Sequence, residues 1–145
     1  MPSRILMVCV GNICRSPTAE VVLRAQLADD SVVVESAGLA ALSGRAIDPL
    51  AESVLQAHGL SGTSHVARQV TRQLIDSADL VLVMEKRHLE VIEGSSLRAI
   101  GKTFLLGKWE GDIDIPDPYR RGPDAFLRSY QMIDRAVADW RARLQ

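Results

Sequence analysis

Four short and almost continuously apolar segments alternate with segments of helical periodicity along this chain of 145 residues. The apolar segments cover residues 5–10, 31–37, 79–84 and 102–106. Apolar runs of this kind are typical of strands that are covered on both faces, as in a parallel sheet. Parallel strands require crossover connections, which are usually helices and almost always right-handed. The pattern therefore predicts an α/β fold, with a four-stranded parallel sheet and helices on both faces.

Start and stop signals support the helices between these strands. Ser16 is placed as the N-cap of the first helix with Pro17 as its first residue, and Asp48 starts a second helix that Gly59 ends. Shorter helices are expected over residues 71–77 and 86–93. After residue 122, an apolar stripe recurs at spacings of four and three, formed by Phe126, Tyr130, Ile133, Val137, Trp140 and Leu144. This spacing predicts a long terminal helix that docks on the sheet.

The composition limits the classes of partner. The chain has 17 basic and 18 acidic residues spread along its length and a formal net charge of −1, so it lacks the electrostatic pattern of a nucleic-acid-binding protein. Its first apolar run is too short for a secretory signal or a membrane span, and two cysteines are too few for a disulfide framework. We therefore expect a single domain over residues 1–145 that works as a monomer in the cytoplasm and is not embedded in a membrane.

The first predicted strand runs directly into the first predicted helix through residues 8–20, VCVGNICRSPTAE, which hold both cysteines. Such a turn aims backbone N–H groups and the positive end of the helix dipole at one point, which favours an anion. Gly11 and Asn12 tolerate positive φ, and Arg15 presents a planar fork to two phosphate oxygens. The glycine patterns of nucleotide-binding loops are missing. The turn predicts a cradle for one phosphate, formed by Val10, Gly11, Asn12, Ile13, Cys14 and Ser16.

Cys9 stands at the first position of this cradle, where the helix terminus, the loop amides and Arg15 all favour a thiolate. A thiolate below a bound phosphate monoester is placed to attack phosphorus in line and to form a phosphocysteine. The leaving oxygen then needs a proton. Asp117, between Pro116 and Pro118, is the best candidate for that acid and for the base that later activates water. This covalent mechanism needs neither a metal nor another cofactor.

Two motifs together resemble those of the low-molecular-weight protein tyrosine phosphatases: Cys9-x5-Arg15-Ser16 at the end of the first strand, and Asp117-Pro118-Tyr119 near the carboxyl end. The resemblance runs through essentially the whole chain and includes Ser36-Ala37-Gly38, Asp48-Pro49, His65-x-Ala67-Arg68-Gln69 and the strand that ends at Met84. Residues 41–42, 84–88 and 115–120 are similar to the bacterial branch that is paired with tyrosine autokinases of capsule and exopolysaccharide export.

This resemblance implies that Cys9 is the nucleophile, Arg15 the phosphate clamp and Asp117 the general acid. It implies a network of hydrogen bonds that holds the loop, formed by Asn12, Ser16, Ser36 and His65. Cys14 would be a redox partner that forms a reversible disulfide with Cys9. The substrate mouth would be formed by Leu42, Tyr119 and Arg120. The implied substrate is a phosphotyrosine-bearing protein, a membrane tyrosine autokinase, and Arg120 with Arg121 would help to attract its anionic tail.

Each assignment has a plainer alternative. Cys9 and Cys14 could be small buried side chains, Asp117 could cap a turn, and His65 could be a structural histidine. A zinc site made from the two cysteines, His58 and His65 lacks the usual ligand spacing. Two other functions stay open. Arsenate reduction needs cysteines outside the loop, and a catalytically silent anion-binding module would be expected to lack Cys9 or Asp117.

Overall fold

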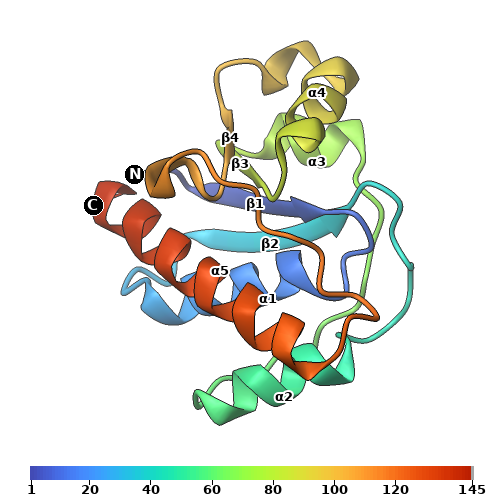
Figure 1. Ribbon diagram of the computed structural model, residues 1–145. Coiled ribbons are helices and arrows are strands. Elements are labelled where there is room, and N and C mark those ends of the chain that lie inside the picture. The colour runs from blue at the N-terminus through green and yellow to red at the C-terminus, as the bar shows by residue number, and fades with distance from the viewer. Residues whose placement is uncertain (145) are drawn as a thin grey trace.

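The computed structural model describes residues 1–144 and shows one sheet between two layers of helices (Figure 1). Its elements are β1 (Arg4–Cys9), α1 (Arg15–Gln26), β2 (Val33–Gly38), α2 (Pro49–Ala57), α3 (Arg72–Ser77), β3 (Leu80–Val83), α4 (Lys86–Ser95), β4 (Thr103–Leu105) and α5 (Pro123–Leu144). Two short 3-10 turns, η1 (Leu97–Ala99) and η2 (Lys108–Glu110), flank β4. The expected strands and helices are all present, with ends shifted by one or two residues. Gln145, which closes the expected domain, lies outside the described residues.

The four strands form one parallel sheet in the order β2-β1-β3-β4. β1 lies between two neighbours, so that Met7 faces Ser36 of β2 on one side and Leu82 of β3 on the other. Because the strands share one direction, their carboxyl ends meet at a single edge, where the arrows of Figure 1 end. The expected fold class is confirmed. In such sheets, ligands bind beyond the carboxyl ends, where neighbouring strands send their connections to opposite faces.

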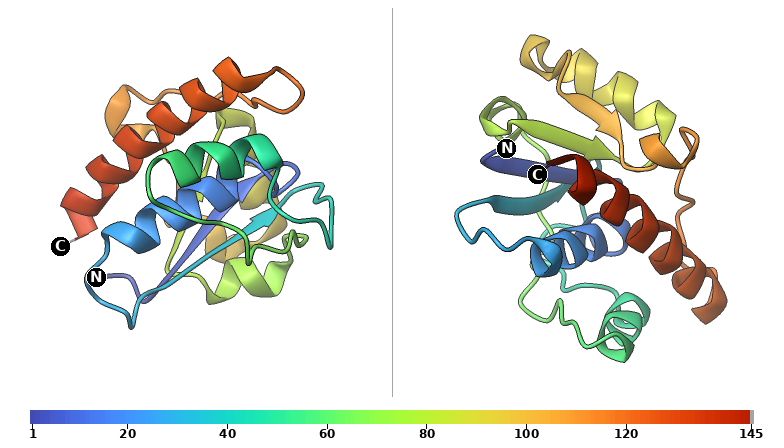
Figure 2. Two further views of the ribbon diagram at one scale, coloured as in Figure 1. Left: turned by 90° about the horizontal axis from the view of Figure 1, so that it is seen from below. Right: turned by 90° about the vertical axis from the view of Figure 1, so that its left-hand side faces the viewer.

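Alternate residues of β1 supply the two halves of the core. Ile5 and Met7 pack with the helices α1, α2 and α5, whereas Leu6 and Val8 pack with α3 and α4 on the other face. All four side chains are fully buried. The right-hand view of Figure 2 shows α3 and α4 on one side of the strands and α1 and α2 on the other. Since successive side chains of a strand point to opposite faces, a strand covered on both sides must be apolar throughout.

The terminal helix α5 packs across α1 and α2 and buries the expected apolar stripe from Phe126 to Trp140, while Leu144 is half-buried. Near its end, the indole Nε1 of Trp140 donates to the carbonyl oxygen of Leu106 at 2.8 Å. This bond ties the helix to the residue that follows β4. The long segment between β4 and α5, which carries Asp117, is therefore anchored at both ends. No helix within residues 1–144 is long and apolar enough to cross a bilayer.

The two N-cap predictions have different outcomes. Asp48 caps α2, because its Oδ1 accepts the backbone N–H of Leu50 at 2.9 Å. Ser16 is not a cap, and that prediction is wrong. α1 begins at Arg15, after Cys14, and no side chain caps it. The hydroxyl of Ser16 is instead engaged by side chains of the turn before the helix, and these contacts outweigh the local capping preference.

Candidate active site

A cavity of about 180 Å³ opens at the carboxyl edge of β1, where the chain turns into α1. This is the turn that the sequence predicts as a phosphate cradle. The cavity is lined by Cys9, Val10, Gly11, Ile13, Cys14, Arg15, Ala40, Leu42, Asp117 and Tyr119. Three separate segments of the chain meet around it: the turn after β1, the segment after β2 and the segment between β4 and α5. The expected nucleophile, clamp and acid therefore share one space.

Two polar groups at the start of α1 lie within hydrogen-bond distance of the Cys9 sulfur. The Ser16 hydroxyl oxygen lies 2.9 Å from Sγ, and the Ser16 backbone N–H donates to the same sulfur at 3.4 Å. The first N–H groups of a helix have no partner within the helix, so they are available to an anion. The Cys9 side chain is only 2% exposed. Two polar groups of Ser16 thus surround this sulfur at the inner end of the cavity.

Asn12 holds the loop from the inside. It is fully buried, and its φ of 59° makes it the left-handed residue of the loop. Its Nδ2 donates to Ser16 Oγ at 2.8 Å and to Ser36 Oγ at 3.0 Å, while its Oδ1 accepts the backbone N–H of Arg68 at 2.9 Å. Because the Ser16 oxygen accepts from Asn12, its own hydrogen is free to point at Cys9. A buried network whose members are all satisfied makes the loop rigid.

The network extends beyond the loop on two sides. The Ser36 hydroxyl donates to Glu20 Oε1 at 2.7 Å, and His65 Nε2 lies 2.6 Å from the carbonyl oxygen of Asn12. The structure thus brings together the four expected members, Asn12, Ser16, Ser36 and His65. Glu20 and Arg68 were missed. Glu20 looks like an ordinary polar residue of α1. Arg68 donates its backbone N–H to Asn12 and its Nε to the carbonyl oxygen of Ser36 at 3.0 Å, and no local pattern reveals these contacts.

Two glycines border the loop, and only one of them is required. Of the two residues expected to tolerate positive φ, Asn12 adopts it and Gly11 does not, and a Cβ on Gly11 would meet only Ile13 and Leu42 at 3.9 Å. At Gly38, the last residue of β2, a Cβ would lie 2.4 Å from the carbonyl oxygen of Val10. The loop therefore depends on glycine at position 38, where two backbone segments touch.

The guanidinium of Arg15 is buried and fixed at one nitrogen. Nη1 donates to Glu85 Oε2 at 2.6 Å and to the carbonyl oxygen of Ile115 at 2.7 Å, which uses both of its hydrogens. Nε has no partner within the described residues, and Nη2 lies 3.8 Å from Asp117 Oδ2, which is too far for a hydrogen bond. The edge formed by Nε and Nη2 therefore remains for a ligand, and it fits two oxygens of a phosphate.

Asp117 faces the cavity from the segment between β4 and α5. Its Oδ1 accepts the backbone N–H of Tyr119 at 3.1 Å, so the carboxylate does stabilise a turn, as the plainer alternative predicted. Its Oδ2 lies on the side of Arg15. The side chain is 44% exposed, which leaves it accessible to water. One oxygen thus holds the turn while the other is available at the cavity.

The chain matches the low molecular weight phosphotyrosine protein phosphatase family over residues 4–145. It belongs to this family. The low molecular weight protein-tyrosine-phosphatase Wzb of Salmonella typhimurium is 46% identical over 140 residues, which cover 97% of this chain and 93% of the relative. Vibrio vulnificus Wzb, solved in complex with benzylphosphonate, is 44% identical with a TM-score of 0.94 over 99% of both chains. The YwlE arginine phosphatase from Geobacillus stearothermophilus is 34% identical with a TM-score of 0.91, over 99% of this chain and 94% of that one.

Family membership confirms the resemblance to the low-molecular-weight tyrosine phosphatases. In this phosphatase, Glu85 is a residue of the site that the sequence did not predict. Its carboxylate binds Arg15, and Arg87 approaches it from solvent with Nε 3.3 Å from Oε1. Burial raises the pKa of Glu85, but the hydrogen bonds from Arg15 and Arg87 outweigh burial and hold the pKa below its usual range. Glu85 is therefore a fixed anion that orients the guanidinium. The sequence feature that could have identified Glu85 as a site residue is its position directly after the predicted buried strand 79–84.

His88 supports Glu85 from the first turn of α4. Its Nδ1 accepts the backbone N–H of Glu85 at 3.2 Å, and its Nε2 lies 3.5 Å from Glu85 Oε2. The ring is buried. Burial and the nearby charge of Arg15 lower the pKa of His88, which favours the neutral ring that this acceptor role requires. A chain of contacts thus leads from α4 through Glu85 to the guanidinium of Arg15.

Cys14, the expected redox partner, is a buried residue of the same loop and lines the cavity together with Cys9. Burial is the main cause that raises the pKa of its thiol, and the negative charge of Asp48 adds to it. Cys14 is therefore a neutral thiol at physiological pH. Of the two cysteines, Cys9 has the sulfur that lies within hydrogen-bond distance of the Ser16 hydroxyl and the Ser16 backbone N–H. This difference favours Cys9 as the nucleophile.

The expected mouth residues surround the opening with apolar surface. Leu42 and Tyr119 line the cavity together with Ile13, and the guanidinium carbon of Arg120 lies 5.1 Å from the centre of the Tyr119 ring. The inner end of the cavity is cationic because of Arg15. A site with apolar walls and a cationic inner end suits a phosphate that is carried on an aromatic group.

Proposed function

We propose that this phosphatase hydrolyses phosphotyrosine in proteins through a phosphocysteine intermediate. The observation that carries the proposal is that Cys9, Arg15 and Asp117 line one cavity whose walls are apolar. The loop N–H groups and the free edge of Arg15 bind the phosphate, and the tyrosine ring lies between Leu42 and Tyr119. This places the phosphorus above the sulfur of Cys9.

In the first step, the Cys9 thiolate attacks phosphorus. The S–P bond forms, the bond between phosphorus and the tyrosine oxygen breaks, and Asp117 gives a proton to that oxygen. In the second step, the Asp117 carboxylate accepts a proton from water while the water oxygen attacks phosphorus. The S–P bond breaks and inorganic phosphate leaves. In both steps Arg15 and the loop amides stabilise charge on the three equatorial oxygens, and the Ser16 hydroxyl donates to the sulfur when it is negative.

An assay with phenyl phosphate tests this mechanism in three proteins. The wild type is expected to turn over and to accumulate a phosphocysteine that rapid quenching and mass spectrometry detect. Cys9→Ser is expected to show no turnover, and Asp117→Ala is expected to lose a factor of about 10²–10⁴ in kcat. A wild type without turnover, or a Cys9→Ser variant that keeps it, would contradict the proposal. Absence of turnover in all three proteins would favour a silent anion-binding module.

Phosphoarginine is a second candidate substrate because the YwlE arginine phosphatase is 34% identical to this chain. A phosphorylated guanidinium carries N–H groups that need acceptors when buried. Ile13, Leu42 and Tyr119 form apolar walls, which instead suit a phenyl ring. We therefore expect kcat/KM for phosphotyrosine to exceed that for phosphoarginine by about a hundredfold or more. Equal values in a side-by-side assay would remove the preference for tyrosine.

The depth of the sulfur favours phosphotyrosine over phosphoserine. Cys9 is 2% exposed, so the phosphorus must reach well into the loop before it meets the sulfur. The long phenolic ester of tyrosine spans that depth, whereas the short ester of serine would draw the substrate backbone against Leu42 and Tyr119. A pair of peptides that differ only in phosphotyrosine and phosphoserine measures this preference as a ratio of kcat/KM. Equal values for the two peptides would contradict it.

The proposed physiological substrate is a membrane tyrosine autokinase of capsule or exopolysaccharide export. Two observations support it: the similarity of residues 41–42, 84–88 and 115–120 to that bacterial branch, and the identity of 46% with the phosphatase Wzb of Salmonella typhimurium. The phosphatase would then act in the cytoplasm as a monomer. Incubation with a phosphorylated autokinase tail should remove phosphotyrosine in the wild type and not in Cys9→Ser. A tail that keeps its phosphotyrosine would contradict this assignment.

Cys14 is the proposed redox partner of Cys9. If peroxide oxidises the Cys9 thiolate to a sulfenic acid, the Cys14 thiol can attack that sulfur, so that a disulfide forms and water leaves. Cys14 belongs to the same loop and lines the same cavity as Cys9, which supports the assignment. After a peroxide pulse, dithiothreitol should restore activity in the wild type and much less in Cys14→Ser. Equal recovery in both would contradict this role.

A further inference from the structure

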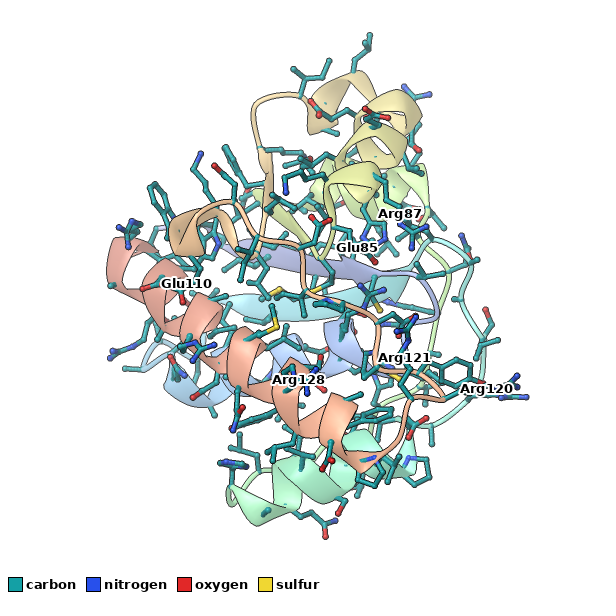
Figure 3. All side chains as sticks on the ribbon, in the orientation of Figure 1. Glu85, Arg87, Glu110, Arg120, Arg121 and Arg128 are labelled. Atoms are coloured by element: carbon teal, nitrogen blue, oxygen red, sulfur yellow. The ribbon has the colours of Figure 1, made fainter. Side chains whose placement is uncertain are left out.

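Arg120 and Arg121 directly follow Tyr119, which lines the cavity, and neither has a carboxylate partner among the described residues. Both side chains are exposed, and within residues 1–144 neither lies within ion-pair distance of an acidic group. Arg87 is also exposed, but its Nε is 3.3 Å from Glu85 Oε1. Figure 3 shows Arg120 pointing away from the body of the molecule, whereas Arg87 lies beside Glu85. Two positive charges beside the opening are therefore not neutralised by the protein.

The backbone of Arg120 adopts a conformation that arginine disfavours. Its φ is 61°, and the N–H of Arg121 donates to the carbonyl oxygen of Pro118 at 2.9 Å, which closes a turn with Arg120 as its third residue. Glycine or asparagine is preferred at such a position. The turn brings the Arg120 guanidinium onto the ring of Tyr119, which lines the cavity. A strained arginine at the edge of a binding cavity indicates a role in binding.

We propose that Arg120 and Arg121 bind carboxylates that flank the phosphotyrosine, so that the phosphatase prefers acidic polypeptide segments. The proposal rests on the proposed function. When the phosphotyrosine occupies the cavity, its neighbours in the substrate chain lie across the rim, because consecutive residues are only about 3.3 Å apart in an extended segment. Stacking on Tyr119 already restrains Arg120, so less side-chain freedom is lost when a carboxylate binds.

The charge of the whole chain indicates that this preference is local. The formal net charge is −1, so the protein as a whole does not attract acidic segments. The carboxylates must therefore be placed by the phosphotyrosine in the cavity before they meet the two guanidiniums. A preference of this kind depends on the position of the acidic residues and is weakened by salt, because both partners are exposed.

Two phosphotyrosine peptides test the proposal, one with glutamates beside the phosphotyrosine and one with glutamines there. The ratio of their kcat/KM values measures the preference for acid. The wild type is expected to favour the glutamate peptide. Arg120→Asn removes the charge with a residue that tolerates positive φ, and it should lower the ratio about three- to fivefold. Arg121→Gln should lower it to a similar extent, and high salt should lower the ratio of the wild type.

The matched control is Arg98→Gln, which removes an exposed arginine of η1, before β4 and thus away from the carboxyl edge of the sheet. It should leave the ratio unchanged. Arg121→Gln serves as the second variant if Arg120→Asn does not fold. Equal kcat/KM for both peptides in the wild type, or an unchanged ratio in both rim variants, would overturn the proposal. Turnover of phenyl phosphate by the wild type is a separate readout. Its absence would contradict the proposed function itself, not the preference for acidic segments.

Discussion

Two loops meet at the cavity but are built in opposite ways. The phosphate loop is the cradle of residues 9–16, and the acid-bearing loop is the segment between β4 and α5 that carries Asp117. In the phosphate loop, Asn12 and Ser16 are completely buried and linked by hydrogen bonds to β2 and to the segment before α3. In the acid-bearing loop, Asp117 is 44% exposed and is held by one bond to its own turn. The first loop must present fixed dipoles before the substrate arrives, whereas the second must exchange a proton with solvent. Rigidity and access are thus divided between two segments.

Asp117→Asn gives the largest expected effect and isolates the acid-bearing loop. The amide cannot give or take the proton, so kcat should fall by a factor of about 10²–10⁴. The amide oxygen can still accept the N–H of Tyr119, and the side chain is half exposed, so the free energy of unfolding should stay close to that of the wild type. Steady-state kinetics and urea denaturation measure the two effects. A large loss of stability would show that this loop is as structural as the phosphate loop.

Glu85→Gln is expected to have the next largest effect, and it acts on the buried side of the comparison. The amide keeps one acceptor for Arg15 but removes the charge, so the guanidinium is held less firmly. We expect kcat/KM for phenyl phosphate to fall about tenfold to a hundredfold, because small displacements of a positioned group are costly. Glu90→Gln is the matched control, since Glu90 is an exposed residue of α4, the helix that begins directly after Glu85. Equal kinetics of the two variants would contradict the orienting role of Glu85.

Gly38→Ala and Gly11→Ala form a matched pair at the phosphate loop. The new Cβ at position 38 would collide with the carbonyl oxygen of Val10, so we expect a loss of about 1–3 kcal/mol in the free energy of unfolding and a weaker enzyme. Position 11 has ordinary contact distances, so the loss there should stay within about 0.5 kcal/mol. Urea denaturation of both variants measures the difference. A larger loss at position 11 would contradict the packing described for the loop.

His88→Asn tests the smallest effect, a dependence of stability on pH. Because the pKa of His88 is lowered in the folded state, the unfolded chain binds more protons between that lowered value and about 6.5. Stability should therefore fall as the pH is lowered through this window, and His88→Asn should remove that part of the fall. The free energy of unfolding at pH 7.5 and pH 5.5 gives the measurement, with His58→Asn as the control on an exposed ring. An unchanged difference in His88→Asn would contradict the buried neutral state.

The fold could be predicted almost completely because its signals are local. Each strand of the sheet is an apolar run, and α5 follows a single stripe from Phe126 to Trp140. The N-cap prediction failed where a side chain has partners outside its own helix. Ser16 is a residue type that favours the N-cap position, but its hydroxyl lies against Cys9 and Asn12. A local preference for the N-cap position stabilises a protein less than a buried network that satisfies several polar groups at once.

Periodicity and motif spacing depend only on neighbouring residues, and they specify the order of strands and helices along the chain and the contiguous cradle from Cys9 to Ser16. Which edge of Arg15 remains for phosphate depends on how distant segments pack. Its Nη1 is bound by Glu85 and by the carbonyl of Ile115, which lie 70 and 100 residues away along the chain. Hydrogen bonds between buried groups form only where distant segments are packed together, and no local pattern specifies that geometry.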